Sequence, residues 1–291
     1  SIILLSTSGR EQATTPPRSS ASSAAIDGVV ITGNTAMLCF FTGTDAVSLG
    51  YAPFALPRSF GEVLTAGGVG LAALSPNRAV YVPSCASAFI GADALCAALA
   101  CDLDDGRTAM LADMGTNGEM LLSHNGRIFA CSPAAGPAFE GGEISRGCGY
   151  IPGAVDRVWV ANGKIFAHTV EDKPAVGICG SGLLDAVACF LEIEEIDETG
   201  AMDGEFLPIA GDVTLTQQDI RALQLAKSAI RAGIECLLSR AGITAEEVAC
   251  YVRLIIRYKI RILLVFLFEV IKCFMIYLMI TNIDAISKFF L

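Results

Sequence analysis

The order of apolar and polar positions in residues 26–250 predicts an α/β protein, with apolar strands and Ala-rich helices separated by Gly and Pro. "GVVITGN" is typical of a buried strand that ends in a Gly-Asn turn, and "TAMLCFFTG" is typical of a short helix that ends at Gly43. In "GNTAM", either Thr35 or Asn34 most simply caps the start of that helix.

Residues 51–87 are interrupted by Pro and Gly, so short strands and loops are expected there. Residues 88–103 are Ala-rich and have helical spacing, with Gly91 near the start of the helix. Three apolar segments follow, "RTAMLADM", "EMLLSH" and "RIFACS", separated by "GTNG" and "NGR". Since Asn125-Gly126 is a strong signal for a tight turn, three consecutive antiparallel strands are the simplest interpretation.

A second hairpin is predicted in "VDRVWVANGKIFAHTV", with its turn at Asn162-Gly163. "VGICGSG" followed by "LLDAVACFLEIEEI" indicates a strand that turns directly into a helix. The last clear helix covers residues 216–242, where Thr216 is a plausible N-cap and Asp219, three residues later, comes close to a capping box.

Both ends of the chain differ from this middle part. Residues 1–25 are rich in Ser, Thr and Pro, and are expected to form a flexible lead-in. Residues 251–291 contain no Gly or Pro and carry six Lys or Arg against two acids. Residues 262–280 are long enough to just span a bilayer, although Glu269 and Lys272 interrupt them. A chain end foreign to the domain, a membrane anchor and a buried helix all stay open for this tail.

Charge and cysteine usage restrict the class of protein. The formal net charge of −10 argues against a general affinity for nucleic acid or anionic membranes. Eleven cysteines are present, but none form a CxxC pair and most lie in apolar runs, which is typical of small buried side chains in a reducing cytoplasm. A cytoplasmic protein without a cysteine-ligated metal site is therefore expected.

The stretch "DMGTNG" is the first candidate for chemistry. A strand that ends in Asp113 and turns through Gly115, Thr116, Asn117 and Gly118 leaves several backbone N–H groups on the inside of the turn. Such a concave set of N–H groups binds phosphate oxygens, and a carboxylate beside it can hold Mg²⁺ through water. A purely structural hairpin explains the same residues.

Two further Gly-rich segments are candidates. Gly180, Ser181 and Gly182 at a helix start could bind an anion, or could simply form a tight, closely packed turn. Residues 136–147, "GPAFEGGEISRG", have a single helical turn predicted around Phe139 and form either a surface loop or a loop that closes over a ligand. The acidic residues 192–205 are best explained as a solvated helix end and turn.

Taken together, these segments resemble a known superfamily. Three strands that open with Asp-x-Gly-Thr, preceded by a helix carrying Asp93, resemble the second half of an actin-like ATPase, the ASKHA superfamily. "GNTAML", "LGYAPF", "GAD", "DMGTNGE", "SPAAGPAFEGGEISRG", "ICGSGLLDAV" and "LTQQDIRALQLAKSAIRAGIECLL", in this order, resemble the ATPase domain of reductive activators of corrinoid proteins. The likeness extends from about Val29 to Val248.

The resemblance implies an α/β, ribonuclease-H-like (actin-like ATPase) fold, with part of the first half and most of the second. The expected organisation is a lead-in at 1–25, the remainder of the first subdomain with its connecting helix at 26–103, a second ribonuclease-H-like subdomain with a phosphate loop at 104–250, and an atypical tail at 251–291.

The resemblance also implies roles for individual residues. Asp113 would hold Mg²⁺ and act with Asp93, the acid of the connecting helix, as the catalytic pair. The phosphates and the wall of the nucleotide pocket would be formed by Gly115, Thr116, Asn117, Gly118, Gly180, Ser181, Gly182 and Glu140.

The implied function is an ATP- and Mg²⁺-dependent reduction of the cobalt of a corrinoid methyl-transfer protein, which would be the partner. The family's iron–sulfur part, first phosphate loop and Gly-rich adenosine loop have no counterpart in this sequence, and there is no clustered cysteine set to hold an iron–sulfur cluster. ATP hydrolysis is therefore open, and the alternative is a nucleotide-incompetent fragment or scaffold module that keeps the fold and a partner surface. An actin-like small-molecule kinase finds no substrate-binding signature here.

Overall fold

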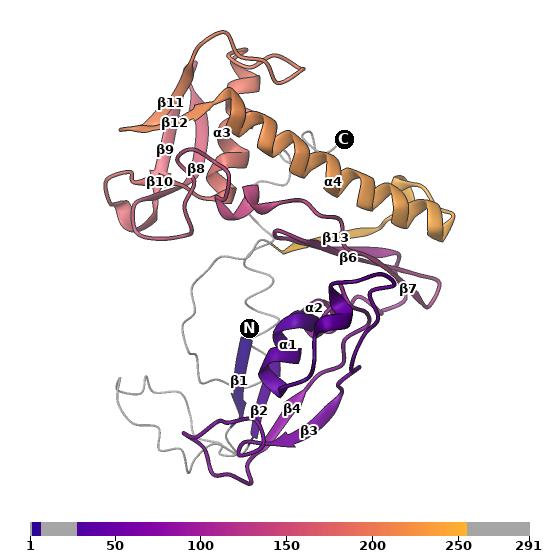
Figure 1. Cartoon of the computed structure of the whole chain (residues 1–291). Coiled ribbons are helices and arrows are strands. Elements are labelled where there is room, and N and C mark those ends of the chain that lie inside the picture. Colours follow the sequence, from indigo (N-terminus) through magenta and orange to yellow (C-terminus); the bar gives the residue numbers. More distant parts are fainter. Residues whose placement is uncertain (1, 7–27, 255–291) are drawn as a thin grey trace, which may run out of the picture. The chain divides into compact units, whose positions relative to one another are not determined.

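A computed structural model describes residues 2–6 and 28–254 of the chain (Figure 1). The described residues fall into two compact units, one up to Gly106 and the other from Arg107 onwards. Residues 262–280, for which a membrane anchor is one of three alternatives, lie outside the described residues. Among those that are described, no helix has the length and apolar character that crossing a bilayer requires.

The first unit is built on a four-stranded sheet. Its strands are β1 (Ile2–Ser6), β2 (Gly28–Thr32), β3 (Glu62–Thr65) and β4 (Ala79–Val82). Their order is β1-β2-β4-β3, with β2 and β4 parallel and the outer pairs antiparallel. The expectation of a flexible lead-in over residues 1–25 is therefore wrong for Ile2–Ser6, because the backbone of these residues pairs with β2.

Two helices complete the first unit, as the sequence predicts. Helix α1 (Thr35–Thr42) ends at Gly43, whose φ of 68° is left-handed, and the side chain of Asn34, rather than that of Thr35, caps its start. Helix α2 (Ala92–Ala100) follows Gly91. Between the two helices, η2 (Val47–Leu49) is a single short turn.

The second unit contains the three predicted antiparallel strands and one more. The strands are β5 (Ala109–Met114), β6 (Gly118–His124), β7 (Arg127–Cys131) and β13 (Cys250–Leu254). They are ordered β13-β5-β6-β7, and β13 is parallel to β5. Strand β13 continues four residues past position 250, into the segment that composition sets apart as a tail.

The rest of the second unit follows β7 in the chain. Its elements are η3 (Pro137–Glu140), β8 (Ala154–Ala161), β9 (Lys164–Thr169), η4 (Val170–Asp172), β10 (Gly177–Ile178), α3 (Gly180–Glu192), β11 (Phe206–Ala210), β12 (Val213–Thr216), α4 (Gln217–Ala241) and η5 (Ala245–Glu247). The predicted hairpin is confirmed as β8–β9, and the predicted helical turn around Phe139 is η3. Strand β10 pairs in parallel with β8 and leads into α3.

Helix α4 is the longest described helix, and Figure 1 shows it running along the β5–β7 sheet. The side chains of Ile220, Leu223 and Ile230 belong to the main core of the unit together with those of β5, β6, η3 and α3. The predicted capping box is present, since Thr216 and Asp219 exchange side-chain-to-backbone hydrogen bonds. The core therefore joins the candidate phosphate loop, η3 and both helices into one packed body.

Candidate functional site

The predicted phosphate loop is the tip of the β5–β6 hairpin. Met114 pairs with Gly118, so Gly115, Thr116 and Asn117 form the turn, and Asp113 lies opposite Glu119. Gly115 and Gly118 are buried, whereas Thr116 and Asn117 are exposed. The turn is tied to the chain after β7 through two backbone bonds: Gly118 N–H donates to Pro133 O (2.9 Å), and Gly136 N–H donates to Thr116 O (3.0 Å).

Both glycines of this loop lie close to the ends of side chains from other elements. A Cβ on Gly118 would lie 2.6 Å from Cδ1 of Ile230 on α4, and a Cβ on Gly115 would lie 3.3 Å from Oε1 of Glu140. Neither glycine has a positive φ. The absence of side chains thus lets the loop pack closely against α4 on one side and against a carboxylate on the other.

Glu140 is the residue that the fold brings to the loop. It is the last residue of η3, and its Oε2 accepts a hydrogen bond from the hydroxyl of Thr116. The described turn and loop hydrogen bonds include none donated by the N–H groups of Gly115, Thr116 or Asn117. The tip therefore combines donors suited to an anion with the carboxylate of Glu140, suited to a hard cation, and the acidic residue Asp113 precedes the turn in β5.

The Gly180-Ser181-Gly182 turn is closely packed. A Cβ on Gly180 would overlap with the carbonyl oxygen of Phe139 and lie 2.9 Å from its carbonyl carbon, and a Cβ on Gly182 would overlap with the carbonyl of Val155. The hydroxyl of Ser181 donates to Asp156 O (2.9 Å). Close packing explains both glycines, and it places the start of α3 against the residue that precedes Glu140.

The segment 136–147 is anchored at its far end as well. Asp219, 1% exposed in the first turn of α4, accepts hydrogen bonds from the N–H and the hydroxyl of Ser145, both at 2.6 Å. The same carboxylate also accepts from the N–H (2.8 Å) and hydroxyl (2.9 Å) of Thr216. Sequence reasoning identified Asp219 only as part of a helix cap, because the contact with Ser145 joins positions far apart in the chain.

Asp93 lies in the first unit, in the first turn of α2. It follows Gly91 and Ala92 at the start of α2, and a Cβ on Gly91 would lie 2.5 Å from Cα of Asn34 and 2.6 Å from the Asp93 carboxylate. The start of α2 is therefore held against the turn after β2. Burial raises the pKa of the Asp93 carboxyl, while the N–H of Ala94 (2.9 Å) partly opposes the shift.

We expect Asp93→Asn to stabilise the protein at neutral pH. Because the pKa of Asp93 is raised in the folded state, the carboxylate costs folding free energy above the ordinary pKa of an aspartate, about 3.9, and this cost grows until the pH passes the folded pKa. The stability gain of the variant should therefore disappear in acid, where both states are protonated. Thermal unfolding of the two proteins as a function of pH measures this difference; equal stability at neutral pH would contradict it.

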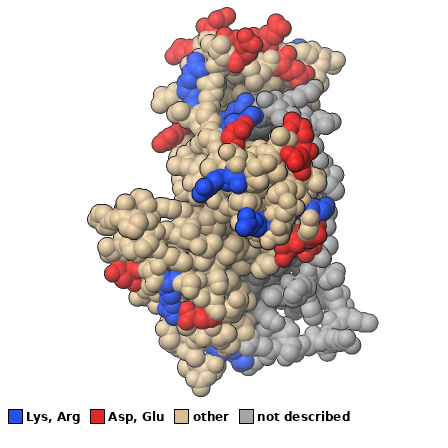
Figure 2. Space-filling model, turned by 90° about the vertical axis from the view of Figure 1, so that its right-hand side faces the viewer, with Lys and Arg blue, Asp and Glu red and all other residues tan. Residues whose placement is uncertain are grey.

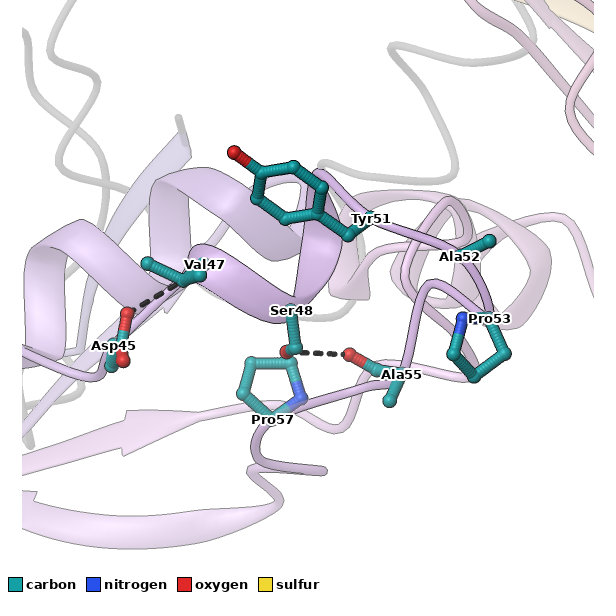
Figure 3. A pocket seen from close by; sticks show the side chains of 8 residues that line it. All are labelled: Asp45, Val47, Ser48, Tyr51, Ala52, Pro53, Ala55 and Pro57. Atoms are coloured by element: carbon teal, nitrogen blue, oxygen red, sulfur yellow. Dashed lines mark hydrogen bonds between the residues drawn. The ribbon is translucent and has the colours of Figure 1, made fainter.

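Two hollows lie away from the predicted residues. The first, about 450 Å³, is formed by the turn after α1, with Asp45 accepting from the N–H of Val47 (2.9 Å) and Ser48 donating to Ala55 O (2.8 Å) (Figure 3).

The second, about 660 Å³, lies between α3 and α4, with Lys227 and Arg231 in its wall. Sequence reasoning missed this second hollow, although the i, i+4 spacing of these cations beside an apolar helix face is visible in the sequence. Arg231 forms an ion pair with Glu235 at 2.6 Å, which partly offsets the positive charge in the wall of the hollow.

Acidic side chains gather at the upper end of the face shown in Figure 2, and few basic ones accompany them there. Glu192, Glu194 and Glu195 at the end of α3 are exposed, as predicted. In the described ranges 2–6 and 28–254, no group of three or more His, Cys, Asp or Glu side chains is arranged to hold a metal ion.

Comparison with known proteins decides the family. Residues 107–252 match the model described as the C-terminal domain of RACo, the ASKHA domain, and residues 12–106 match the RACo middle region. The chain belongs to the RACo family of reductive activators. The expected actin-like α/β fold and the resemblance to corrinoid activators are thereby confirmed.

Individual relatives agree with the RACo assignment. The chain is 30% identical to the corrinoid activation enzyme RamQ of Eubacterium limosum, over 72% of this chain and 40% of RamQ. It is 28% identical to the [Co(II) methylated amine-specific corrinoid protein] reductase of Methanosarcina barkeri, over 76% of this chain and 47% of that protein. A solved structure of a reductive activator for corrinoid, iron–sulfur protein superimposes with a TM-score of 0.69 at 28% identity, over 77% of this chain and 39% of the other. The chain thus spans less than half the length of these relatives.

Proposed function

We propose that residues 107–254 bind the phosphates of ATP together with Mg²⁺, through the loop Gly115–Gly118. One observation carries this proposal: the carboxylate of Glu140 is held at the tip of the hairpin by the Thr116 hydroxyl, beside Gly115 and close to backbone N–H groups. Backbone N–H groups and a carboxylate side by side at a glycine turn are the groups that a magnesium-bound phosphate uses.

The residues present fit a magnesium-bound phosphate better than a bare one. A phosphate near Gly115 would be repelled by Glu140 and Asp113, and a divalent cation between them would convert this repulsion into attraction. Mg²⁺ commonly uses one or two carboxylates and completes its shell with phosphate oxygens and water. A site of this kind needs no preformed cluster of three protein ligands.

The remaining predicted residues receive supporting roles. Asp113 would hold Mg²⁺ through water from the end of β5, whereas the catalytic role of Asp93, in the first unit, rests on the family resemblance alone. Gly180, Ser181 and Gly182 would support the wall of the site, since the start of α3 packs against Phe139. When bound, ATP would supply the free energy for closing the protein around its partner.

The biological role that follows is reductive activation of a corrinoid protein in the cytoplasm. This proposal rests on the RACo family and on relatives whose names specify corrinoid proteins as targets. The partner would be a corrinoid protein whose cobalt has been oxidised. An iron–sulfur cluster, the electron source expected for the family, would have to come from outside the described residues.

Calorimetric titration of Mg-ATP into the full chain tests the proposal. We expect binding that EDTA abolishes and that Asp113→Asn weakens by at least about tenfold, because loss of a charged acceptor for the water shell of Mg²⁺ costs more than about 1.4 kcal/mol. The matched control is Asp212→Asn, an exposed acid in the turn between β11 and β12 of the same unit, which should leave binding unchanged. Absence of binding to the unaltered chain would favour the nucleotide-incompetent scaffold instead.

A further inference from the structure

The backbone of residues 146–148 pairs with β10 on the side away from β8. Gly147 bridges Ile178 in a parallel arrangement, in which Ile178 N–H donates to Arg146 O (2.8 Å) and Cys148 N–H donates to Ile178 O (2.9 Å). On its other side, Ile178 pairs with Val155 of β8. Each of the two bridged residues is followed directly by a cysteine, Cys148 on one segment and Cys179 on the other.

The two cysteine side chains share one face of this small sheet. Side chains alternate along extended backbone, so residues that follow a bridged pair point to the same side. In agreement, Cys148 packs against a buried cluster formed by Ala154, Val170 and Cys179. The sulfur of Cys148 lies over Gly177, 2.7 Å from the position of a Cβ there, so its side chain already points toward β10.

Backbone spacing at such a bridge suits a disulfide. Neighbouring strands lie about 4.8 Å apart, and disulfides join Cα atoms separated by about 4.4–6.8 Å. Gly177 leaves room above β10 for a sulfur atom, since a larger residue would overlap with the Cys148 side chain.

We propose that Cys148 and Cys179 form a reversible disulfide, an oxidation site that fixes the segment 141–148 to the start of α3. With hydrogen peroxide as the two-electron oxidant, the Cys148 thiolate attacks one peroxide oxygen, the O–O bond breaks, and a sulfenic acid and one water form. The Cys179 thiolate then attacks the sulfenic sulfur, the S–S bond forms and the second water leaves. Two thiol protons and two electrons have passed to the peroxide, and a dithiol reductant reverses the change.

The order of the two steps follows from exposure. Cys179 is 6% exposed, whereas Cys148 is only partly buried and meets the oxidant first. Burial raises the pKa of the Cys148 thiol, and the neighbouring Cys179 adds to the shift. Since the thiolate is the nucleophile, oxidation should be slow at neutral pH and faster in alkaline buffer.

The position of the cross-link gives it a consequence for the nucleotide loop. Cys179 directly precedes Gly180, which packs against Phe139, and Cys148 ends the segment that begins after Glu140. The disulfide would therefore hold Glu140 and its bond to Thr116 in place from both sides. This regulatory part of the inference rests on the proposed nucleotide binding; the disulfide itself does not.

The test is peroxide treatment of the folded full chain in alkaline buffer, followed by alkylation of free thiols and peptide mapping without reduction. We expect one dominant cross-linked peptide pair containing positions 148 and 179, and its loss in Cys148→Ser and in Cys179→Ser. Cys189→Ser is the matched control, because Cys189 is a buried cysteine of α3 whose pKa burial raises to about 11. It should keep the cross-link at the level of the unaltered chain.

Alkylation of both Cys148 and Cys179 after oxidation would overturn the proposal, as would a cross-linking pattern equal to that of the urea-unfolded chain. Mg-ATP titration of the oxidised and reduced forms separates the two hypotheses. A reduced chain that binds no nucleotide contradicts the proposed function. The peptide map tests the disulfide whatever the outcome of that titration.

Discussion

Gly180→Ala should destabilise the second unit by about 3 kcal/mol or more, because the added methyl group would overlap with the carbonyl oxygen of Phe139. Either α3 or η3 must move to make room, and both belong to the same core. Urea unfolding of the full chain, followed by circular dichroism, measures the change in free energy of unfolding. A fall in the soluble yield is the expected accompanying sign.

Gly149→Ala is the matched control for this substitution. Position 149 is exposed, has no heavy atom within 4 Å of an added Cβ and has no positive φ. Its replacement should change the free energy of unfolding by less than about 0.5 kcal/mol. Equal stability of Gly180→Ala and Gly149→Ala would contradict the prediction, because it would show that the start of α3 accommodates the added methyl group.

Asp219→Ala is expected to cost about 4 kcal/mol. It removes the buried, charged acceptor of four hydrogen bonds from Ser145 and Thr216. Chemical denaturation gives the loss of stability. Hydrogen exchange at the Ser145 amide should also accelerate, because the anchor of segment 141–147 is gone.

Glu247→Ala provides the comparison for this second prediction. Glu247 makes the equivalent capping contact in η5, accepting from the N–H of Thr244 at 2.7 Å, but at an exposed position. Its loss should cost about 1 kcal/mol or less. If Asp219→Ala costs no more than this, the carboxylate acts only as a helix cap and the bond to Ser145 contributes nothing to stability.

The parts of the fold that the sequence predicts correctly are those set by short-range chemistry. The turns of the β6–β7 and β8–β9 hairpins each contain Asn-Gly, and Asn125 and Asn162 have positive φ, as tight hairpin turns require. The capping box of α4 is equally local. In each case the residues that decide the structure lie within four positions of one another.

Strand partners far apart in the chain could not be predicted in this way. Strands β1 and β13 lie in segments whose average composition suggests a lead-in and a foreign tail, yet their backbones pair with β2 and β5. The same holds in the site: "DMGTNG" is recognisable, but only the fold shows that Glu140 contacts Thr116. For Gly180 and Gly182, the pattern leaves anion binding and close packing equally open, and the carbonyl groups of Phe139 and Val155 supply the reason for packing.

The position of β13 has a consequence for how the protein is made. Cys250–Leu254 pair with Ala109–Asp113, roughly 140 residues earlier, so during synthesis the outer edge of β5 has no strand beside it until the ribosome has released nearly the whole second unit. An open strand edge is a site for pairing with other chains. Chains cut short before position 250 should therefore associate through β5, and chaperone binding to the nascent chain should persist until β13 emerges.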